Sequence, residues 1–546
     1  MTTTLRLGVI LTGLLSTVAF AQDAGTRSAG RLPVLVVLPP ASDDAAAREL
    51  AMLIQARAYG QLLATNKFAL PHIKQVLSML SGEGLKADQL KTPEDAERVA
   101  RRLGADAFVY GQLTTDPKGY ALTATAQPVG KKPVKVTPQK LDVSNAMVKS
   151  VEDAGDALAM TLYKLVITDK KQPLVLQDVP PSTLSDNAMR SFAQCYGTLM
   201  RQPAGIENPT VLDETELRVA VEACEKAAKD DPGFSGAQAG LALAFAILGD
   251  DTRAVKALKL VDPADAKQPL AWQARFWLVT RYESPAAGEA VLREAIASQP
   301  GFLLARSYLA ELLDTLGEHP KASEAWKAYG ELVPNDPFIR TRLARSLARQ
   351  GKFPEAISLA KEVVAANPNS RDAKLQLANC YIDANQWDEA VAVLEQLKPL
   401  PEASADVFLR LGWASFRKGD AAAAKPLYEE ALARATKPGQ WRMRGRAHYD
   451  LALVHLKNKD NAKAEESLKS AMATGFRLRE VDPAIASLLK KLEKAEPKGK
   501  VPYRPPQNSA QTREVSLFPM NQFGEVDPTA KPELPDGFQW SAGDFK

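Results

Sequence analysis

Few residues in this chain have the type and spacing that chemistry at a protein site requires. His448 and His455 stand seven positions apart, which places them on one face of an expected helix. Two histidines do not complete a metal site and no third ligand accompanies them, so we interpret both as core residues. The sequence has no phosphate-binding loop, no nucleophile elbow and no zinc-protease helix pattern. We therefore expect no enzymatic activity, no metal and no cofactor.

Three cysteines are the next candidates for chemistry. Cys195 and Cys224 fall on two neighbouring expected helices, 29 positions apart. An oxidising compartment would allow a disulfide between them, worth about 3 kcal/mol on the chain-entropy model. Cys380 stands singly on another expected helix, and free cysteines are common as small core side chains. We favour two buried, reduced cysteines at 195 and 224 and keep the disulfide as the alternative.

Charge and composition exclude two classes of function. The chain has 546 residues with 69 Lys and Arg against 65 Asp and Glu, and this balance does not predict nucleic-acid binding. With 45% hydrophobic and 25% charged residues, it is not a polytopic membrane protein.

Four lysines cluster near an expected turn, where they would either meet an anionic cell-wall polymer or simply face solvent: Lys131, Lys132, Lys135 and Lys140.

The first residues have the pattern of an export signal. Arg6 precedes the apolar stretch 7–20, and Ala19 and Ala21 supply small residues for signal-peptidase cleavage. The stretch is short for a membrane span. We predict a signal peptide over 1–21, cleaved after Ala21, and a mature chain without a transmembrane segment that is periplasmic or secreted.

After a linker over 22–31, residues 32–168 are expected to form a small α/β domain. An apolar run over 34–38 predicts a strand buried on both faces, and helical periodicity follows it. Two further strands flank a turn at Asp116-Pro117-Lys118-Gly119, where proline and glycine favour chain reversal. A third strand near 134–143 and a helix over 144–166 complete the unit.

This order resembles the small amino-terminal domain of TolB-like proteins. The resemblance rests on the Asn66-Lys67-Phe68 step, the run at 100–106 and the hairpin. Related domains occur in curli-type and flagellar outer-membrane assembly factors. In that family the domain is a docking module, so the resemblance implies docking rather than catalysis.

A repeat with a period of 34 residues occupies most of the remaining chain. Ala310, Ala344, Ala378 and Gly412 are each 34 positions apart, and a second small residue stands twelve positions after each of them. Two small residues at this spacing allow two antiparallel helices to pack closely. Glycines between the two positions predict the end of each first helix, at Gly249, Gly317, Gly351 and Gly419.

This pattern resembles the tetratricopeptide repeat family. The resemblance implies an all-α solenoid, a right-handed superhelix of helix pairs, with about eight units over 187–495 after a linker at 169–186. The last segment, from Pro483 to Lys494, is expected to be a capping helix. The first unit carries an insertion near 203–213.

In this family, the first helix of each unit lines a concave groove that holds a protein or peptide. The family's groove positions correspond in this sequence to Trp277, Arg281, Arg345, Arg349, Asn379, Asp383, Trp413, Phe416 and Arg417. Tryptophan, phenylalanine and arginine commonly anchor interfaces, so the resemblance implies that these residues bind the partner. The alternative is that Trp413 and Phe416 pack only against the neighbouring unit.

Residues 496–546 are expected to form a flexible tail, because eight prolines lie between Pro497 and Pro535. After Leu517 the tail also contains five aromatic residues, which would let it dock on its own solenoid or on a partner: Phe518, Phe523, Phe538, Trp540 and Phe545.

We therefore expect an exported, non-catalytic scaffold that binds protein partners and assembles or tethers components of a bacterial envelope. The alternative is an accessory subunit of a cell-wall or secretion enzyme, in which the amino-terminal domain binds polymer.

Overall fold

The computed structural model describes most of the chain between residues 31 and 474. Within this range, it does not describe residues 83–89, 91, 118, 170, 177–178, 180–182, 203–209, 335, 367, 369, 400–403 and 437–439. Beyond residue 474, it describes residues 485, 488, 512–515 and 517. The predicted signal peptide, and all of the first linker except Arg31, lie outside the described residues. Within those residues, no helix has both the length and the apolar character that crossing a membrane requires.

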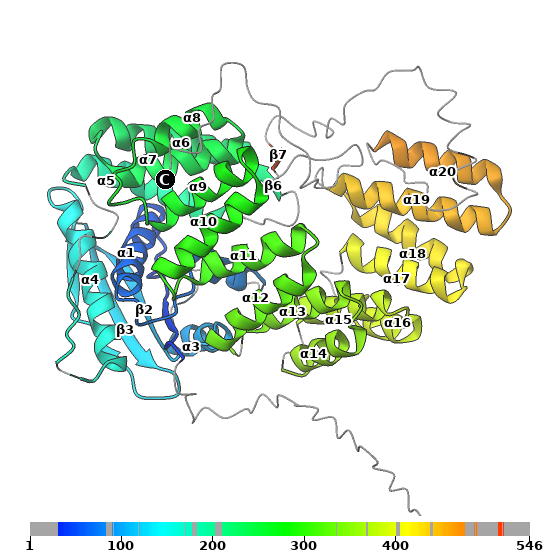
Figure 1. Ribbon diagram of the computed structural model, residues 1–546, viewed down its shortest axis with the longest axis horizontal. Helices are drawn as coiled ribbons and strands as arrows, with labels where there is room; N and C mark the ends of the chain where they lie inside the picture. The colour runs from blue at the N-terminus through cyan, green and yellow to red at the C-terminus, as the bar shows by residue number, and fades with distance from the viewer. Residues whose placement is uncertain are drawn as a thin grey trace, which may run out of the picture. The chain divides into compact units, whose positions relative to one another are not determined.

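The amino-terminal part contains a five-stranded sheet, whose strands β2 and β3 are labelled in Figure 1. Its strands are β1 (Leu35–Val37), β2 (Ala107–Asp116), β3 (Gly119–Pro128), β4 (Val134–Lys135) and β5 (Gln139–Asp142). β1 pairs with β2 in parallel, β2 and β3 form the predicted antiparallel hairpin, and both β4 and β5 pair with β3. The predicted third strand is thus two short strands. Pro138, which cannot donate a backbone hydrogen bond, lies between them.

Four helices accompany this sheet: α1 (Ala45–Ala64), α2 (Ile73–Gly82), α3 (Pro93–Arg102) and α4 (Met147–Val166). The side chain of Asp44 caps α1 by accepting from the Ala47 amide at 2.7 Å, and Thr92 caps α3 in the same way. α1 and α4 pack on each other, and α4 also packs on β3. Their contact includes an ion pair of 2.9 Å between Arg57 and Asp156.

Sixteen more helices follow within the described residues, and each odd-numbered helix packs against the even-numbered helix after it. The eight pairs confirm the predicted helical repeat. The bounds are α5 (Asp186–Arg201), α6 (Glu214–Asp230), α7 (Ser235–Leu248), α8 (Asp251–Leu258), α9 (Pro269–Tyr282), α10 (Pro285–Ser298), α11 (Leu303–Thr315), α12 (His319–Leu332), α13 (Pro337–Arg349), α14 (Phe353–Ala366), α15 (Arg371–Asp383), α16 (Trp387–Glu395), α17 (Ala405–Lys418), α18 (Ala421–Arg434), α19 (Trp441–Lys457) and α20 (Asn461–Ala473).

The small residues of the repeat lie where the two helices of a pair meet. Ala310, Ala344 and Ala378 are fully buried. At Gly412, a Cβ atom would stand 2.7 Å from the ring of Tyr428, so this position accepts no larger side chain without rearrangement.

The first helices of several pairs end at a residue in the left-handed region. Gly249 and Gly419 occupy the C-cap positions of α7 and α17 with φ values of 74° and 108°. Asn385 takes the equivalent place after α15 with a φ of 58°. Such a residue lets the chain reverse into the second helix.

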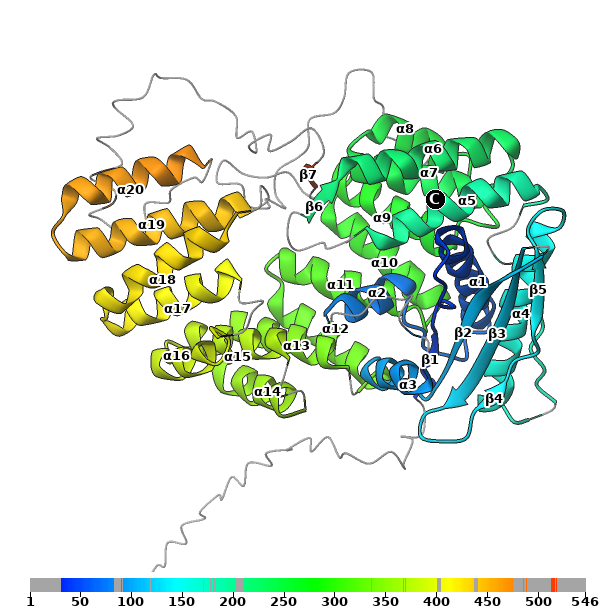
Figure 2. The same cartoon turned by 180° about the vertical axis from the view of Figure 1, so that it is seen from behind.

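One apolar core joins the sheet part to the first helix pairs. It runs from Leu35 in β1 through Leu313 in α11 to Ala322 in α12, and it includes Leu517. The Leu70 amide donates to the Gly301 carbonyl at 3.0 Å. The Gln75 side chain of α2 donates to the Tyr329 hydroxyl of α12 at 2.6 Å, and α2 lies beside α11 and α12 in Figure 2. At Gly301 a Cβ would lie 1.7 Å from the Phe68 carbonyl oxygen, so only glycine permits this approach. The segment 169–186 thus connects two parts that share a core.

Part of the carboxyl-terminal segment docks on the first repeat unit. The predicted insertion contains β6 (Thr210–Asp213), which pairs antiparallel with β7 (Thr512–Val515). Leu517, just after β7, is fully buried in the core that contains α5 to α11. Of the two alternatives for the tail, a flexible segment or one docked on its own solenoid, docking therefore holds at these residues, because backbone pairing and apolar burial fix them. The rest of the tail lies outside the described residues, as does the predicted capping helix except for Ile485 and Leu488.

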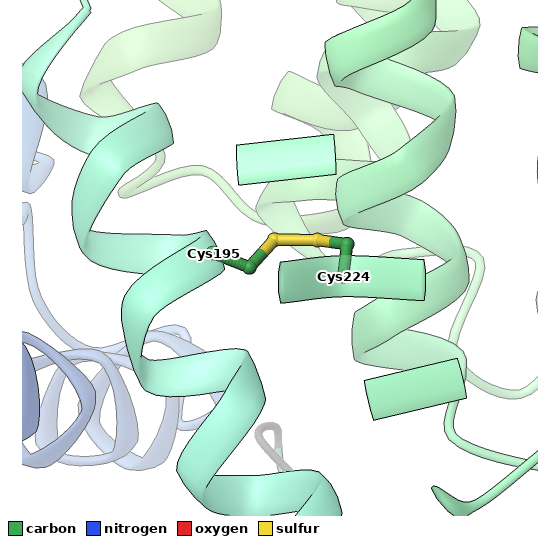
Figure 3. Close-up of a disulfide and its surroundings, with 2 residues drawn as sticks. All are labelled: Cys195 and Cys224. Atoms are coloured by element: carbon green, nitrogen blue, oxygen red, sulfur yellow. A yellow bond between two sulfur atoms is a disulfide. The ribbon is translucent and has the colours of Figure 1, made fainter. Parts of the chain in front are cut away.

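Cys195 of α5 and Cys224 of α6 form a disulfide, which corrects our preference for two reduced thiols (Figure 3). Their Cα atoms are 5.2 Å apart, a normal separation for a disulfide. Sequence position alone did not show that the two side chains face each other across the helix pair. Gly240 of α7 leaves room for the bond, because a Cβ there would lie 2.7 Å from the Cys224 sulfur. Cys380 is free and buried, as predicted.

Candidate functional site

The first helices of the last four pairs form one surface, which we call the first-helix face. It consists of the sides of α13, α15, α17 and α19 that carry the predicted binding positions. α13 contacts α15, the Arg410 side chain of α17 donates to Asn379 of α15, and α17 contacts α19, so these helices are neighbours in space. Seven of the nine predicted residues lie on this face: Arg345, Arg349, Asn379, Asp383, Trp413, Phe416 and Arg417.

Aromatic rings and an arginine are stacked near the carboxyl end of α17. The rings of Trp413 and Phe416 stack with centroids 6.2 Å apart. The guanidinium of Arg417 lies 5.3 Å from the Trp413 centroid and 4.8 Å from that of Trp387 in α16. Each contact places a cation near an aromatic ring, which is an attractive arrangement. Two rings therefore contact the Arg417 guanidinium, and because Arg417 is exposed, the guanidinium still reaches solvent.

Two further cations from α19 join this stack. Arg446 lies 5.1 Å from the Trp413 centroid, and the Lys457 ammonium lies 5.2 Å from that of Phe416. We call the set the aromatic–cation cluster. Its members are Trp387, Trp413, Phe416, Arg417, Arg446 and Lys457.

The aromatic–cation cluster has a positive balance of charge. Of its three cations, Arg446 is paired at 2.9 Å with Asp450, which is 1% exposed. Burial raises the pKa of Asp450 to about 6, although Arg446 opposes that rise. Arg417 and Lys457 remain exposed. The cluster therefore offers cations and aromatic surface on the same face.

Trp413 and Phe416 also contact the neighbouring unit. Both are half-buried and pack against the apolar cluster of α19 and α20. Packing against the neighbouring unit thus accounts for part of their surface, and the remaining part is exposed on the first-helix face.

A polar group lies beside the aromatic–cation cluster, toward α13. The Arg410 side chain of α17 donates a hydrogen bond to the Asn379 side chain of α15. Desolvation by neighbouring atoms raises the pKa of the Asp383 carboxyl, and the charges of Arg349 and Arg410 oppose that rise. Arg349 is exposed and Arg345 is half-buried. Residues from three helices thus meet at this point.

The two remaining predicted residues are placed differently. Trp277 of α9 is 5% exposed, in the core shared with the sheet part. Arg281 lies 5.7 Å from the Trp277 ring centroid and pairs at 2.8 Å with Asp251, whose side chain is 5% exposed. The structure therefore buries Trp277, pairs Arg281 with Asp251, and does not bring either together with the other seven residues.

The two histidines, which we expected to be core residues, are only half-buried. Burial lowers the pKa of both His448 and His455, which favours the neutral form. In the part of the chain that the structure describes, no three His, Cys, Asp or Glu side chains gather as a metal site would require.

A hollow of about 710 Å³ lies among α16, α17 and α18. Its lining includes Lys398, Lys418 and Arg434, and each of these cations pairs with a carboxylate, namely Glu395, Asp388 and Glu430 in that order. Since these charges neutralise one another, we favour the first-helix face as the functional surface.

Sequence reasoning missed Trp387, Arg446 and Lys457. Lys457 stands five positions after Ala452, as Arg417 does after Gly412, so the same register carried past the six-residue slip would have found it. Trp387 belongs to a second helix, and the register for first helices gives no signal for it.

Comparison with known proteins identifies the repeat. Residues 347–407 and residues 409–475 each match a family model described as tetratricopeptide repeat. No curated protein matches the chain.

Solved structures give distant likenesses. A tetratricopeptide repeat protein from Parabacteroides merdae is 13% identical, with 56% of this chain and 98% of that protein covered and a TM-score of 0.36. Yeast Tom70 is 15% identical, with 64% and 75% covered and a TM-score of 0.40. MamA from Desulfovibrio magneticus, from residue 41 on, is 18% identical, with 32% and 94% covered and a TM-score of 0.27. The family matches therefore identify tetratricopeptide repeats in this chain at 347–407 and 409–475.

Proposed function

We propose that this protein is a scaffold that binds a protein partner on the first-helix face of α13 to α19. Tetratricopeptide repeats are protein-interaction modules, and two of their models match this region. The observation that carries the proposal is the aromatic–cation cluster, in which rings and exposed cations share one face. Such side chains bury large areas and form directional contacts at interfaces. We propose that this role is non-catalytic.

The partner-binding residues of the proposal are seven of those expected from the register. Arg349, Asp383 and Arg417 supply exposed charges, and Trp413 with Phe416 supplies apolar area. Arg345 and Asn379 complete the set toward α13 and α15. Trp277 and Arg281 are left out, because one is buried and the other is engaged with Asp251.

We place this scaffold outside the cytoplasm, in a bacterial envelope, where it would assemble or tether components. The leader pattern over 1–21 supports export. The Cys195–Cys224 disulfide supports an oxidising compartment, since such bonds are rare where thiols are kept reduced. The TolB-like resemblance of 32–168 supports a docking role for the sheet part.

A second candidate is an accessory subunit that binds cell-wall polymer through the sheet part. One observation favours it: Lys131, Lys132, Lys135 and Lys140 are all exposed around β4 and β5. Anionic polymer would be attracted to this edge.

A comparison of partner recovery distinguishes the two candidates. The tagged mature protein is crosslinked in its native envelope and purified, with Trp413→Ala plus Arg417→Gln as the test variant. We expect recovery of one discrete protein partner to fall by roughly thirtyfold in the variant, as for loss of an interface hot spot.

Two results would count against the first-helix face. One is equal recovery from the test variant and from the control Lys463→Gln plus Lys469→Gln, which changes exposed lysines of the second helix α20. The other is recovery of cell-wall polymer in place of a protein, which would favour the accessory subunit. Circular dichroism of each variant verifies that the fold is retained.

A further inference from the structure

The carboxyl-terminal segment 518–546 is rich in acidic and aromatic residues, unlike the stretch that precedes it. It contains five acidic residues against two lysines. It also contains five aromatic residues, Phe518, Phe523, Phe538, Trp540 and Phe545. The preceding stretch 497–513 contains only basic charges, namely Lys498, Lys500, Arg504 and Arg513. Acidic and aromatic character is therefore concentrated after Leu517.

This composition complements the aromatic–cation cluster. The cluster presents exposed Arg417 and Lys457 beside the rings of Trp413 and Phe416. Arg349 adds a further exposed cation on the same face. A segment with carboxylates and aromatic rings could pair with the cations and pack on the indole and phenyl surfaces.

The structure also tethers this segment to the helix pairs. β7 pairs with β6, and Leu517 is fully buried, so the acidic segment starts from a docked point. Its 29 residues span up to about 95 Å when extended, at about 3.3 Å per residue. The α17–α18 pair follows the α5–α6 pair by six repeats, or about 60 Å if neighbouring first helices are about 10 Å apart. The segment is therefore long enough to reach the cluster, and the tether raises its effective concentration there.

We propose that residues 518–546 bind the aromatic–cation cluster of the same chain, so that the chain covers its own first-helix face. This contact does not depend on the existence of a partner. If the partner of the proposed function binds the same face, it must displace the segment, and binding becomes competitive.

A photo-crosslinker in the segment tests the proposal on the full chain. Phe538 is replaced by benzoylphenylalanine, and the crosslinked peptides are identified by mass spectrometry. We expect crosslinks within one chain to peptides of α17 or α19. Their yield should fall about tenfold in Arg417→Gln, as expected when a charge-assisted contact is lost.

The matched control is Lys469→Gln, which removes one exposed cation from a second helix and should leave the yield unchanged. Circular dichroism of Arg417→Gln tests whether the fold is intact. We expect it to be intact, because the Arg417 side chain is exposed. Absence of crosslinks to α17 and α19, or an equal yield in both variants, would overturn the proposal. Crosslinks between two chains would also overturn it, because the occupant would then be a second copy. None of these results depends on partner recovery, so the proposed function succeeds or fails separately.

Discussion

At the scale of single residues, the buried carboxyl of Asp336 gives the fold a dependence on pH. Asp336 is 9% exposed and caps α13, where its side chain accepts from the Phe338 amide at 2.8 Å. Burial raises its pKa to about 7, although the backbone amides oppose that rise. The native state therefore holds this proton more tightly than the unfolded chain does. The resulting stability is fully present below about pH 4 and is lost as the pH rises through about 7.

Asp336→Asn should remove this dependence while keeping a side chain that can cap α13. We expect the variant to melt at a higher temperature than the unsubstituted chain at pH 8, and this advantage to disappear near pH 4. Between the two pH values, the difference in unfolding free energy between the variant and the unsubstituted chain should change by on the order of 1 to 3 kcal/mol. Thermal melting of both chains across this range provides the measurement.

Asp460 provides a control, because its contribution to stability should depend on pH in the opposite direction. It caps α20, and the hydrogen bond from the Lys463 amide lowers its pKa. Its carboxylate therefore stabilises the fold above the unfolded pKa, and this contribution is lost as the pH falls. Asp460→Asn should be destabilising at pH 8 and neutral at low pH. The same pH trend in both variants would contradict the account of Asp336.

At the scale of elements, the disulfide between α5 and α6 fixes the first helix pair. It joins residues 29 positions apart, which corresponds to about 3 to 4 kcal/mol on the chain-entropy model. The same pair carries β6, on which β7 docks. Loss of this bond should therefore also destabilise the docking of β7 on β6.

The double variant Cys195→Ala plus Cys224→Ala should be less stable than the unsubstituted chain by about 2 to 5 kcal/mol. Chemical denaturation, with and without reductant, provides the measurement. Reductant should destabilise the unsubstituted chain and leave the double variant unaffected. If the unsubstituted chain does not respond to reductant, the bond has no such role.

The helices were predictable from the sequence, whereas two pairings were not. Small residues such as Ala344 and Ala356 repeat at the helix contact, so spacing alone predicted the pairs. The β6–β7 pairing joins segments about 300 residues apart, and neither strand carries a local sign of its partner. Likewise, position on a helix did not reveal that Cys195 faces Cys224.

At the scale of the whole molecule, the core shared by the sheet part and the helices up to α11 has consequences for cooperativity. Phe302, at the start of α11, is 1% exposed and forms a backbone bridge with Leu70 of the sheet part. Its ring lies 6.5 Å from that of His72. The helices α17 to α20 have apolar clusters of their own.

Phe302→Ala should therefore loosen the sheet part and α9 to α12 together. A buried Phe→Ala change costs about 3 to 5 kcal/mol, because it removes apolar contacts and leaves a cavity. Hydrogen exchange should accelerate in β1, β2 and α9 to α12 while α17 to α20 keep their protection. Faster exchange confined to α11 would show that the two parts unfold separately.

The shared core also explains which part of the candidate site was predictable. The register assigns Arg349, Asp383 and Trp413 to the first helices α13, α15 and α17, on which the structure places them. It does not identify what packs on those helices. Trp277 has the same register position as Trp413 but lies in the core shared with the sheet part.

The central claim is that the first-helix face of α13 to α19 binds protein segments. The most direct measurement places benzoylphenylalanine at Phe416, on that face, and compares it with the same substitution at Ala433, an exposed residue of the second helix α18. We predict that position 416 crosslinks the segment 518–546 or a protein partner in the native envelope, and that position 433 crosslinks neither. Equal capture at the two positions, or none at 416, would contradict the claim.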